Sequence, residues 1–295
     1  MDHEKKRGRG LMAKRQTDLS SVRRGAGNAF IVLILIIAAI ITLFPIYMAV
    51  LNSLKSDGEM LNRVLSLPTR PAFSNYADAY RKIDFLRSFW NTIVVTITGV
   101  AGIILFASMA GYKMSRTPGK LSHFLFALFV LSSLIPFHSI LITLVKISKE
   151  LKVQGTTLGL GLIYIGLGVA LAIFLYHGFV KSIPRDLDEA ALMDGCGDFR
   201  LFFVIIFPLL LPITATVAIL NALWMWNDFL LPLLMLTDSD YYTLLISTNM
   251  LFGEYNNDWS AILASLVLTM LPIMVVYLLL QKYILSGIAE GAIKG

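Results

Sequence analysis

The sequence predicts an all-α, polytopic membrane protein with six transmembrane helices and a short cytoplasmic helix between the fourth and the fifth. Three observations lead to this prediction. Charged residues make up only 15% of the 295 residues, against roughly 25% in an average soluble protein. Hydrophobic residues make up 57%, and the mean hydropathy is +0.73. Finally, five stretches of membrane-spanning length contain no Asp, Glu, Lys or Arg. A soluble globule and a disordered chain are both disfavoured.

The five uncharged stretches are predicted to cross the membrane as helices. Lipid offers the backbone no hydrogen-bond partner, so a crossing needs about 20 mostly apolar residues in a helix. The stretches are 28–51, 89–112, 121–145, 157–179 and 261–280.

A sixth apolar stretch, 201–236, is too long for one crossing and too short for two crossings with a turn. It is interrupted by Pro208, Pro212 and Pro232 and by the polar and aromatic cluster 224–228. We expect one span followed by a partial helix near the far interface, where Trp is common.

The N-terminal segment 1–27 is predicted to be a basic cytoplasmic leader, because it holds eight basic and three acidic residues. The first apolar run is too long for a secretory signal, so we expect an uncleaved anchor. Residues 28–295 then form one transmembrane domain with both chain ends in the cytoplasm.

The distribution of basic residues supports this topology in most loops. Sixteen Lys and Arg fall inside and nine outside, and the predicted outer loop 237–260 contains none. Lys146, Lys149 and Lys152, in another outer connection, argue against it. The other long outer loop, 52–88, is expected to hold short helices and no separate domain.

The spans lack the ionisable side chains that channels, pumps and ion-coupled transporters usually keep at membrane depth. His123, His138 and His177 lie near predicted span ends, where satisfied interface residues are commoner than ligands. The single cysteine, Cys196, excludes a disulfide framework and a multi-cysteine metal site. We expect energy to enter from outside the membrane, although a sodium site built from backbone carbonyls stays open.

The cytoplasmic loop 181–200 is predicted to form a short helix followed by the start of a second helix. Gly195 and Gly197 are expected to end the first helix, and Asp198 to cap the next. Such a helix across the ends of two spans would transmit a push to both, whereas the alternative is a simple connecting loop. The start signals are Ser182 as cap, Pro184 in the first turn, and the acidic Asp186, Asp188 and Glu189.

At these residues the chain resembles the inner-membrane permeases of type I ATP-binding-cassette importers. The signature of that family is Glu-Ala-Ala, three residues, Gly, nine residues, then Ile-x-Leu-Pro. The spacing is intact, and Phe207 stands where the family prefers Leu. The matching residues here are Glu189, Ala190, Ala191, Gly195, Ile205, Phe207 and Pro208.

Further segments resemble the carbohydrate branch of these permeases and are similar to the smaller membrane subunit of the maltose importer. They are Asn75 and Tyr76 with 89–92, the run 226–232, and 281–283 leading to Gly287 and 291–295.

The resemblance implies that the Glu-Ala-Ala loop docks into a cleft on an ATPase subunit. We expect two small alanines to permit close approach and Glu189 to offer a charge to a basic partner. The implied coupling residues are Glu189, Ala190, Ala191, Asp194, Gly195 and Pro208.

The resemblance also implies an outer loop that reaches into an extracytoplasmic solute-binding protein, although a Trp-anchored interfacial loop is the alternative. Its contact residues would be Phe252, Gly253, Glu254, Tyr255 and Asn256. Candidates for the substrate path are Asn221, Trp224, Asn227 and Asn91, which interface anchoring or helix packing explain nearly as well.

The implied protein is therefore one half of a heterodimeric pore, in the inner or plasma membrane of a prokaryote. Its expected partners are a homologous second permease, two copies of a cytoplasmic ATPase that hold ATP and Mg, a solute-binding protein, a sugar and membrane lipid. The chain contains no phosphate-loop motif, so we expect it to bind no cofactor or metal and to be no enzyme. The excess of basic residues indicates cytoplasmic loops rather than binding of nucleic acid. The alternatives are a secondary transporter or channel working without an ATPase, and a membrane-embedded enzyme.

Overall fold

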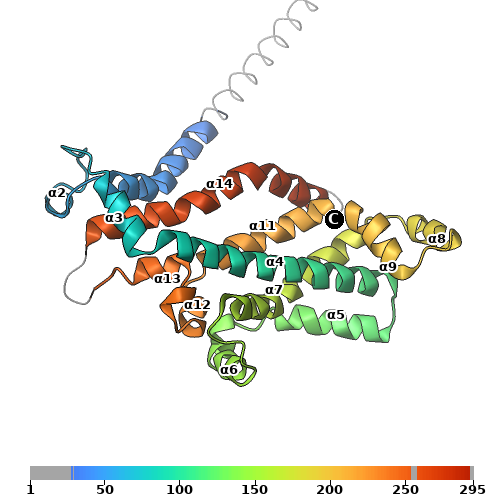
Figure 1. Cartoon of the computed structure of the whole chain (residues 1–295). Helices are drawn as coiled ribbons and strands as arrows, with labels where there is room; N and C mark the ends of the chain where they lie inside the picture. Colours follow the sequence, from blue (N-terminus) through green and yellow to red (C-terminus); the bar gives the residue numbers. More distant parts are fainter. Residues whose placement is uncertain (1–27, 29, 254–257, 293–295) are drawn as a thin grey trace, which may run out of the picture.

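The computed structural model describes residues 28, 30–253 and 258–292, and all regular elements in these residues are helices. Figure 1 shows α4, α7, α11 and α14 running along one long axis, with α8 at one end and α2 and α3 at the other. These ends are called the α8 end and the α3 end below. After an initial helix, Phe30–Ser53, the elements are α2 (Asp57–Asn62), α3 (Ser74–Lys82), α4 (Phe85–Arg116), α5 (Lys120–Ser132), α6 (Phe137–Glu150), α7 (Thr157–Val180), α8 (Asp186–Met193), α9 (Asp198–Arg200), the π-helical turn η1 (Leu201–Ile206), α10 (Phe207–Leu209), α11 (Leu211–Asn227), α12 (Leu230–Met235), the 3-10 turn η2 (Ser239–Tyr241), α13 (Leu244–Asn249) and α14 (Trp259–Ala292).

The predicted all-α membrane architecture is confirmed. Four helices are each long and apolar enough to cross a membrane, and the number reaches six if each of two bent helix pairs forms one span. The first of the four, Phe30–Ser53, leaves the bundle, and the apolar side chains along most of its length are exposed (Figure 1). Lipid or another transmembrane chain must cover those side chains.

Helix α4 is longer than the predicted span 89–112 by four residues at each end. Its 32 residues extend about 48 Å, whereas the hydrocarbon core of a bilayer is about 30 Å thick. Its last turns therefore reach past the membrane core toward α8. Helix α7 agrees closely with the predicted span 157–179, and the Thr156 side chain caps it by accepting a hydrogen bond from the Gly159 N–H at 3.1 Å.

Small residues allow α4 and α7 to pack closely. A Cβ atom added at Gly111 of α4 would come within 2.7 Å of the Tyr176 Cβ, and one at Gly161 of α7 within 2.7 Å of the Thr98 Cβ. Such contacts are typical of helix pairs in membranes, where close backbone approach replaces the hydrophobic driving force. The two helices therefore form one rigid pair.

The predicted third span, 121–145, is not one continuous helix. Two helices, α5 and α6, occupy this region and meet at an angle of 101°. The chain leaves the helix before Pro136, which has no backbone N–H and disfavours helical geometry at the residue before it. Each helix alone is only about 20 Å long, too short to cross the hydrocarbon core.

The interpretation of 201–236 as a span with a following partial helix is confirmed by α11 and α12. The sequence did not reveal that the segment Asp198–Leu209 continues from the loop and bends by 77° into α11. The bend falls at Leu210, between Pro208 and Pro212, which lack backbone donors. The last predicted span, 261–280, is confirmed by α14, which contains Pro272.

Loop 52–88 folds against the bundle at the α3 end and contains α2 and α3, as expected. Lys55 is fully buried there, and its ammonium donates to Asn52 Oδ1 at 3.0 Å and to the carbonyls of Arg63 and Val64 at 2.8 and 3.0 Å. Three acceptors offset the cost of removing this charge from water. The loop is thereby fixed to the end of the first helix.

Ionic contacts tie the same loop to the start of α14. Lys82 donates to Asp258, and this hydrogen bond, followed by one from the Ala261 N–H, holds the pKa of Asp258 below its usual value. The Ser260 hydroxyl and N–H both donate to the Asp57 carboxylate. These contacts fix the α3 end around the helix termini.

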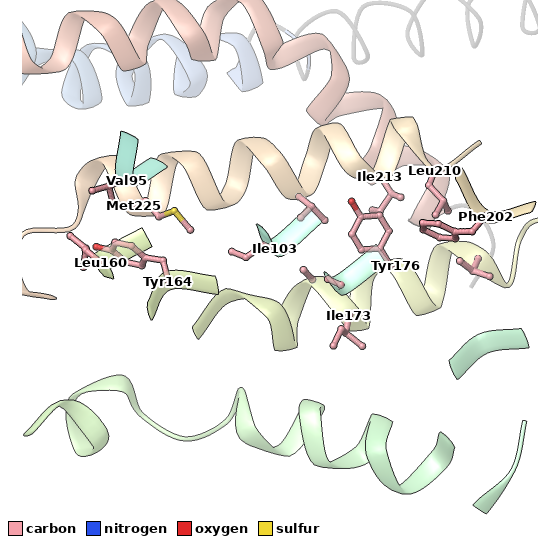
Figure 2. Packing of buried hydrophobic residues seen from close by; sticks show 14 of the residues in the cluster. Val95, Ile103, Leu160, Tyr164, Ile173, Tyr176, Phe202, Leu210, Ile213 and Met225 are labelled. Carbon is pink, nitrogen blue, oxygen red and sulfur yellow. The ribbon is translucent and has the colours of Figure 1, made fainter. Parts of the chain in front are cut away.

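The buried core lies between α4, α7 and α11 (Figure 2). Two fully buried tyrosines of α7 keep their hydroxyls satisfied. Tyr176 donates to Thr214 Oγ1 at 2.9 Å, and Tyr164 donates to the Asp228 carboxylate at 2.8 Å. The Asp228 carboxylate also accepts from the Leu230 N–H and so fixes the start of α12.

Candidate functional site

The predicted short helix in loop 181–200 is confirmed as α8, at one end of the molecule (Figure 1). Its end agrees with the sequence, because Gly195 has φ +78°, a value that favours glycine. The predicted caps are wrong. The Ser182 hydroxyl donates to the Phe179 carbonyl, and Asp198 is the first residue of α9, preceded by Gly197 as cap.

One buried ion pair attaches α8 to the end of α4. The Asp188 carboxylate accepts a hydrogen bond from the Tyr112 hydroxyl at 2.5 Å and lies 2.9 Å from the Arg116 guanidinium. The side chains of Arg116 and Asp188 are 10% and 12% exposed. Arg116 also donates to the Ile183 carbonyl at 3.0 Å, so it holds the chain that leads into α8.

This anchor is the functional feature that sequence reasoning missed. Asp188 was assigned only a favourable position near the helix N-terminus, and 76 positions separate it from Tyr112. The available signal was the four-residue spacing of Tyr112 and Arg116, which places both on one face of the last turns of α4. The sequence does not say which acid that face contacts.

Other residues of α8 are exposed to solvent. Glu189 and Ala190 are exposed, and Met193 is 87% exposed. Ala191 is buried in the core cluster of this chain, so the two alanines of the signature lie on different faces. Ala190 alone is placed for close approach of another protein, whereas Ala191 packs α8 against its own bundle.

Two other predicted coupling residues do not lie on that exposed surface of α8. Gly195 supplies the turn that ends the helix, as its φ shows. Pro208 lies in α10, immediately before the 77° bend. Asp194 is exposed directly after α8. Phe199 of α9, a few residues further along the chain, is 72% exposed. The sequence analysis did not select this large apolar side chain.

A cavity of about 450 Å³ separates part of α8 from α4, α9 and η1. Tyr112, Arg116 and Asp188 line it together with Glu189 and Leu192. Because this space lies between α8 and the bundle, the Asp188 contacts provide much of the polar attachment of α8.

Three of the predicted substrate-path residues lie at a spacing of three along α11. Asn221 and Asn227 each donate one amide hydrogen to a carbonyl four residues earlier, at 2.8 Å. The Trp224 ring is partly exposed and packs edge-on against Tyr164, with ring centres 5.2 Å apart. This side of α11 therefore combines amide groups with an aromatic face.

Asn91 uses its side chain differently. Its amide donates to the carbonyls of Asp240 and Tyr242, at 2.8 and 3.0 Å, and so holds η2 against α4. These contacts give Asn91 a role in the packing of the α3 end.

The predicted binding-protein loop is only partly described. Phe252 packs edge-on against Trp259, with ring centres 6.1 Å apart, and Gly253 is exposed. Glu254, Tyr255 and Asn256 lie outside the described residues.

Comparison with known proteins shows the family. Residues 82–290 match the family described as "Binding-protein-dependent transport system inner membrane component". The chain belongs to this family, and it is a transport permease with membrane-spanning helices.

Several relatives are similar over most of their length. The "Probable starch degradation products transport system permease protein" of Thermoanaerobacterium thermosulfurigenes is 36% identical, over 88% of this chain and 94% of the relative. The "Melibiose/raffinose/stachyose import permease protein" of Bacillus subtilis is 33% identical, over 92% and 100%. A chain from a bacterial ABC transporter that imports the acidic polysaccharide alginate has the same fold, with a TM-score of 0.77 and 24% identity, over 88% of this chain and 95% of that chain.

The anchor predicts that Asp188→Asn loosens α8. Removing the carboxylate charge leaves the nearly buried Arg116 without its counterion, which costs about 3–5 kcal/mol in comparable buried pairs. The only cysteine of the chain, Cys196, lies three residues beyond α8 and is partly buried. Its rate of maleimide labelling in native membranes should rise about tenfold or more, because local opening exposes the thiol.

The matched control is Asp186→Asn, which removes the same charge from an exposed residue of the same helix. It should label at the unmodified rate. Equal labelling rates for Asp188→Asn, Asp186→Asn and the unmodified chain would show that the ion pair does not hold α8.

Proposed function

We propose that this chain is one of two permease subunits of an ATP-driven, binding-protein-dependent sugar importer and forms half of its translocation pore. The observation that carries the proposal is α8. It is a short helix with an exposed outer surface, fixed by Asp188 to the last turns of α4. Family membership and the sugar names of the relatives support the same assignment.

In this proposal α8 docks on a cytoplasmic ATPase, with Glu189, Ala190 and Met193 on the contact surface. ATP and Mg are held by two ATPase copies, and closure of that pair displaces α8. Since Asp188 connects α8 to Arg116 and Tyr112, the displacement passes to α4. Because close glycine contacts join α4 to α7, the two helices move together. Their movement opens the pore alternately to the two sides of the membrane.

The proposed orientation places the α8 end in the cytoplasm of a prokaryotic cell, together with the basic segment 1–27 and the C-terminus. The α3 end then faces outward, where loop 237–260, with no Lys or Arg, receives the solute-binding protein. A homologous second permease completes the pore.

The face of α11 that carries Asn221, Trp224 and Asn227 is the proposed contribution of this chain to the sugar path. The side-chain oxygen of the exposed Asn227 can accept a hydrogen bond from a hydroxyl group, whereas that of Asn221 lies against Gly168 of α7. The indole of Trp224 offers an apolar ring face. Starch degradation products, melibiose and raffinose are named for the relatives, so oligosaccharides are the first substrates to test.

Glu189→Lys should abolish uptake while leaving the chain in the membrane. The residue is exposed, so the substitution leaves the fold intact but reverses the charge offered to the ATPase. The measurement is uptake of labelled maltodextrin, melibiose and raffinose by cells, with the amount of chain in the membrane as a second readout.

Glu150→Lys, an equal charge reversal on the exposed end of α6, is the control and should retain uptake. Normal uptake by the Glu189 variant would remove the docking assignment.

Deletion of 252–256 should block delivery from the binding protein without releasing the ATPase. The segment lies at the proposed outer end, far along the chain from α8. The deleted chain should still copurify with the ATPase, and its ATP hydrolysis should no longer respond to loaded binding protein. Stimulation equal to that of the undeleted chain would exclude this segment as the binding-protein contact.

A further inference from the structure

A second cavity, of about 560 Å³, lies at the α8 end and shares Arg116 and Arg185 with the one beneath α8. The end of α4, the beginning of α5, the end of α7 and the loop leading to α8 surround it. Figure 1 shows these helix ends close to one another at that end of the molecule. Basic or polar side chains that line the cavity include Ser115, Arg116, His123, His177, Lys181 and Arg185.

The charged residues that line the cavity are all basic. Three permanent cations line it, Arg116, Lys181 and Arg185, and none of the described lining residues is Asp or Glu. Asp188 neutralises Arg116, whereas Lys181 and Arg185 form no ion pair within the described part of the chain. Two positive charges therefore remain without a counterion, and an anion in the cavity is attracted to both.

Buried polar atoms in the same wall lack partners. Among the described residues, Arg116 Nε and Ser115 Oγ are buried and make no hydrogen bond. Both residues line the cavity, and their side chains are about nine-tenths or more buried. Leaving such donors unpaired is costly, so an anionic oxygen that reached this wall would gain hydrogen bonds from them. The first turn of α5, where a helix favours negative charge, adds Ser122 to the lining.

The surroundings indicate an amphiphilic anion. The cavity lies at the ends of α4 and α7, which are each long and apolar enough to cross a membrane, and at the start of α5. The ends of membrane-spanning helices are where lipid headgroups lie. Phe126 of α5 lines it and stacks on His177, with ring centres 4.0 Å apart. From there α5 continues as a helix without buried residues, and Phe124 and Leu128 are exposed. An apolar surface thus begins at the cationic cavity and runs along α5.

We propose that this cavity binds the phosphate of an anionic phospholipid, with its acyl chains along α5. Lys181 and Arg185 supply the uncompensated charge, and Arg116 Nε and Ser115 Oγ donate from the wall. Arg116 also holds Asp188, so the bound lipid supports the end of α4 from which α8 is anchored. The proposal does not depend on which solute the protein transports.

Native mass spectrometry of the delipidated full-length chain, purified with the subunits that accompany it, tests this site. Phosphatidylglycerol is titrated against phosphatidylcholine with the same acyl chains. We expect phosphatidylglycerol to bind about tenfold more tightly, and Lys181→Gln with Arg185→Gln to remove most of that preference. Both residues are exposed, so the fold tolerates the change, and the Cys196 labelling rate verifies that it does.

The control, Lys146→Gln with Lys149→Gln, removes the same charge from exposed residues of α6 and should keep the preference. Equal losses in both double variants, or equal binding of the two lipids, would overturn the proposal. A further arm adds soluble glycerol 3-phosphate at the lipid concentration. It should leave the lipid bound, and displacement would assign the cavity to a free phosphate instead.

Discussion

The contact between Asp188 and the pair Tyr112 and Arg116 is the constraint on which the arrangement of the α8 end depends. It is made possible by the length of α4, which extends past the hydrocarbon core and brings a hydroxyl and a guanidinium to the loop 181–200. A nearly buried ion pair is rigid in a way that an exposed pair is not, because separating it leaves a charge without solvent or partner. The ion pair therefore joins α8 directly to the end of α4.

A continuous series of packing contacts and hydrogen bonds leads from α4 into the bundle. Glycine contacts join α4 to α7. The buried Tyr164 and Tyr176 of α7 are shown in Figure 2. They hydrogen-bond to Asp228, directly after α11, and to Thr214, near its start. The same α11 presents the amide and indole face proposed for the sugar path. The lipid proposed for the cationic cavity would be a second contact at the end of α4, next to Arg116. In the proposed function, coupling and substrate passage thus depend on the same packing of α4, α7 and α11.

The sequence predicted what depends on local composition. Spans such as 157–179 follow from uncharged apolar length, and Gly195 ends α8 because few other residues adopt its backbone angles. It did not predict what depends on distant partners. The contact of Asp188 with Tyr112, the burial of Ala191 and the buried position of Lys55 are set by tertiary packing across many residues. The break before Pro136 was not predicted, because the uncharged stretch 121–145 has the length of one span. The family resemblance identified the signature residues, but it did not show which of them are exposed and which are buried against the bundle.

Photocrosslinking from position 193 in native membranes tests the central claim most directly, because Met193 is 87% exposed at the end of α8. A photoreactive amino acid there should attach predominantly to an ATP-binding subunit, and the same probe at the exposed Glu150 of α6 should not. That result would establish α8 as the site where energy enters the transporter. Crosslinks from position 193 only to lipid or to another copy of this chain, with the chain intact in the membrane, would contradict the account and favour transport without an ATPase.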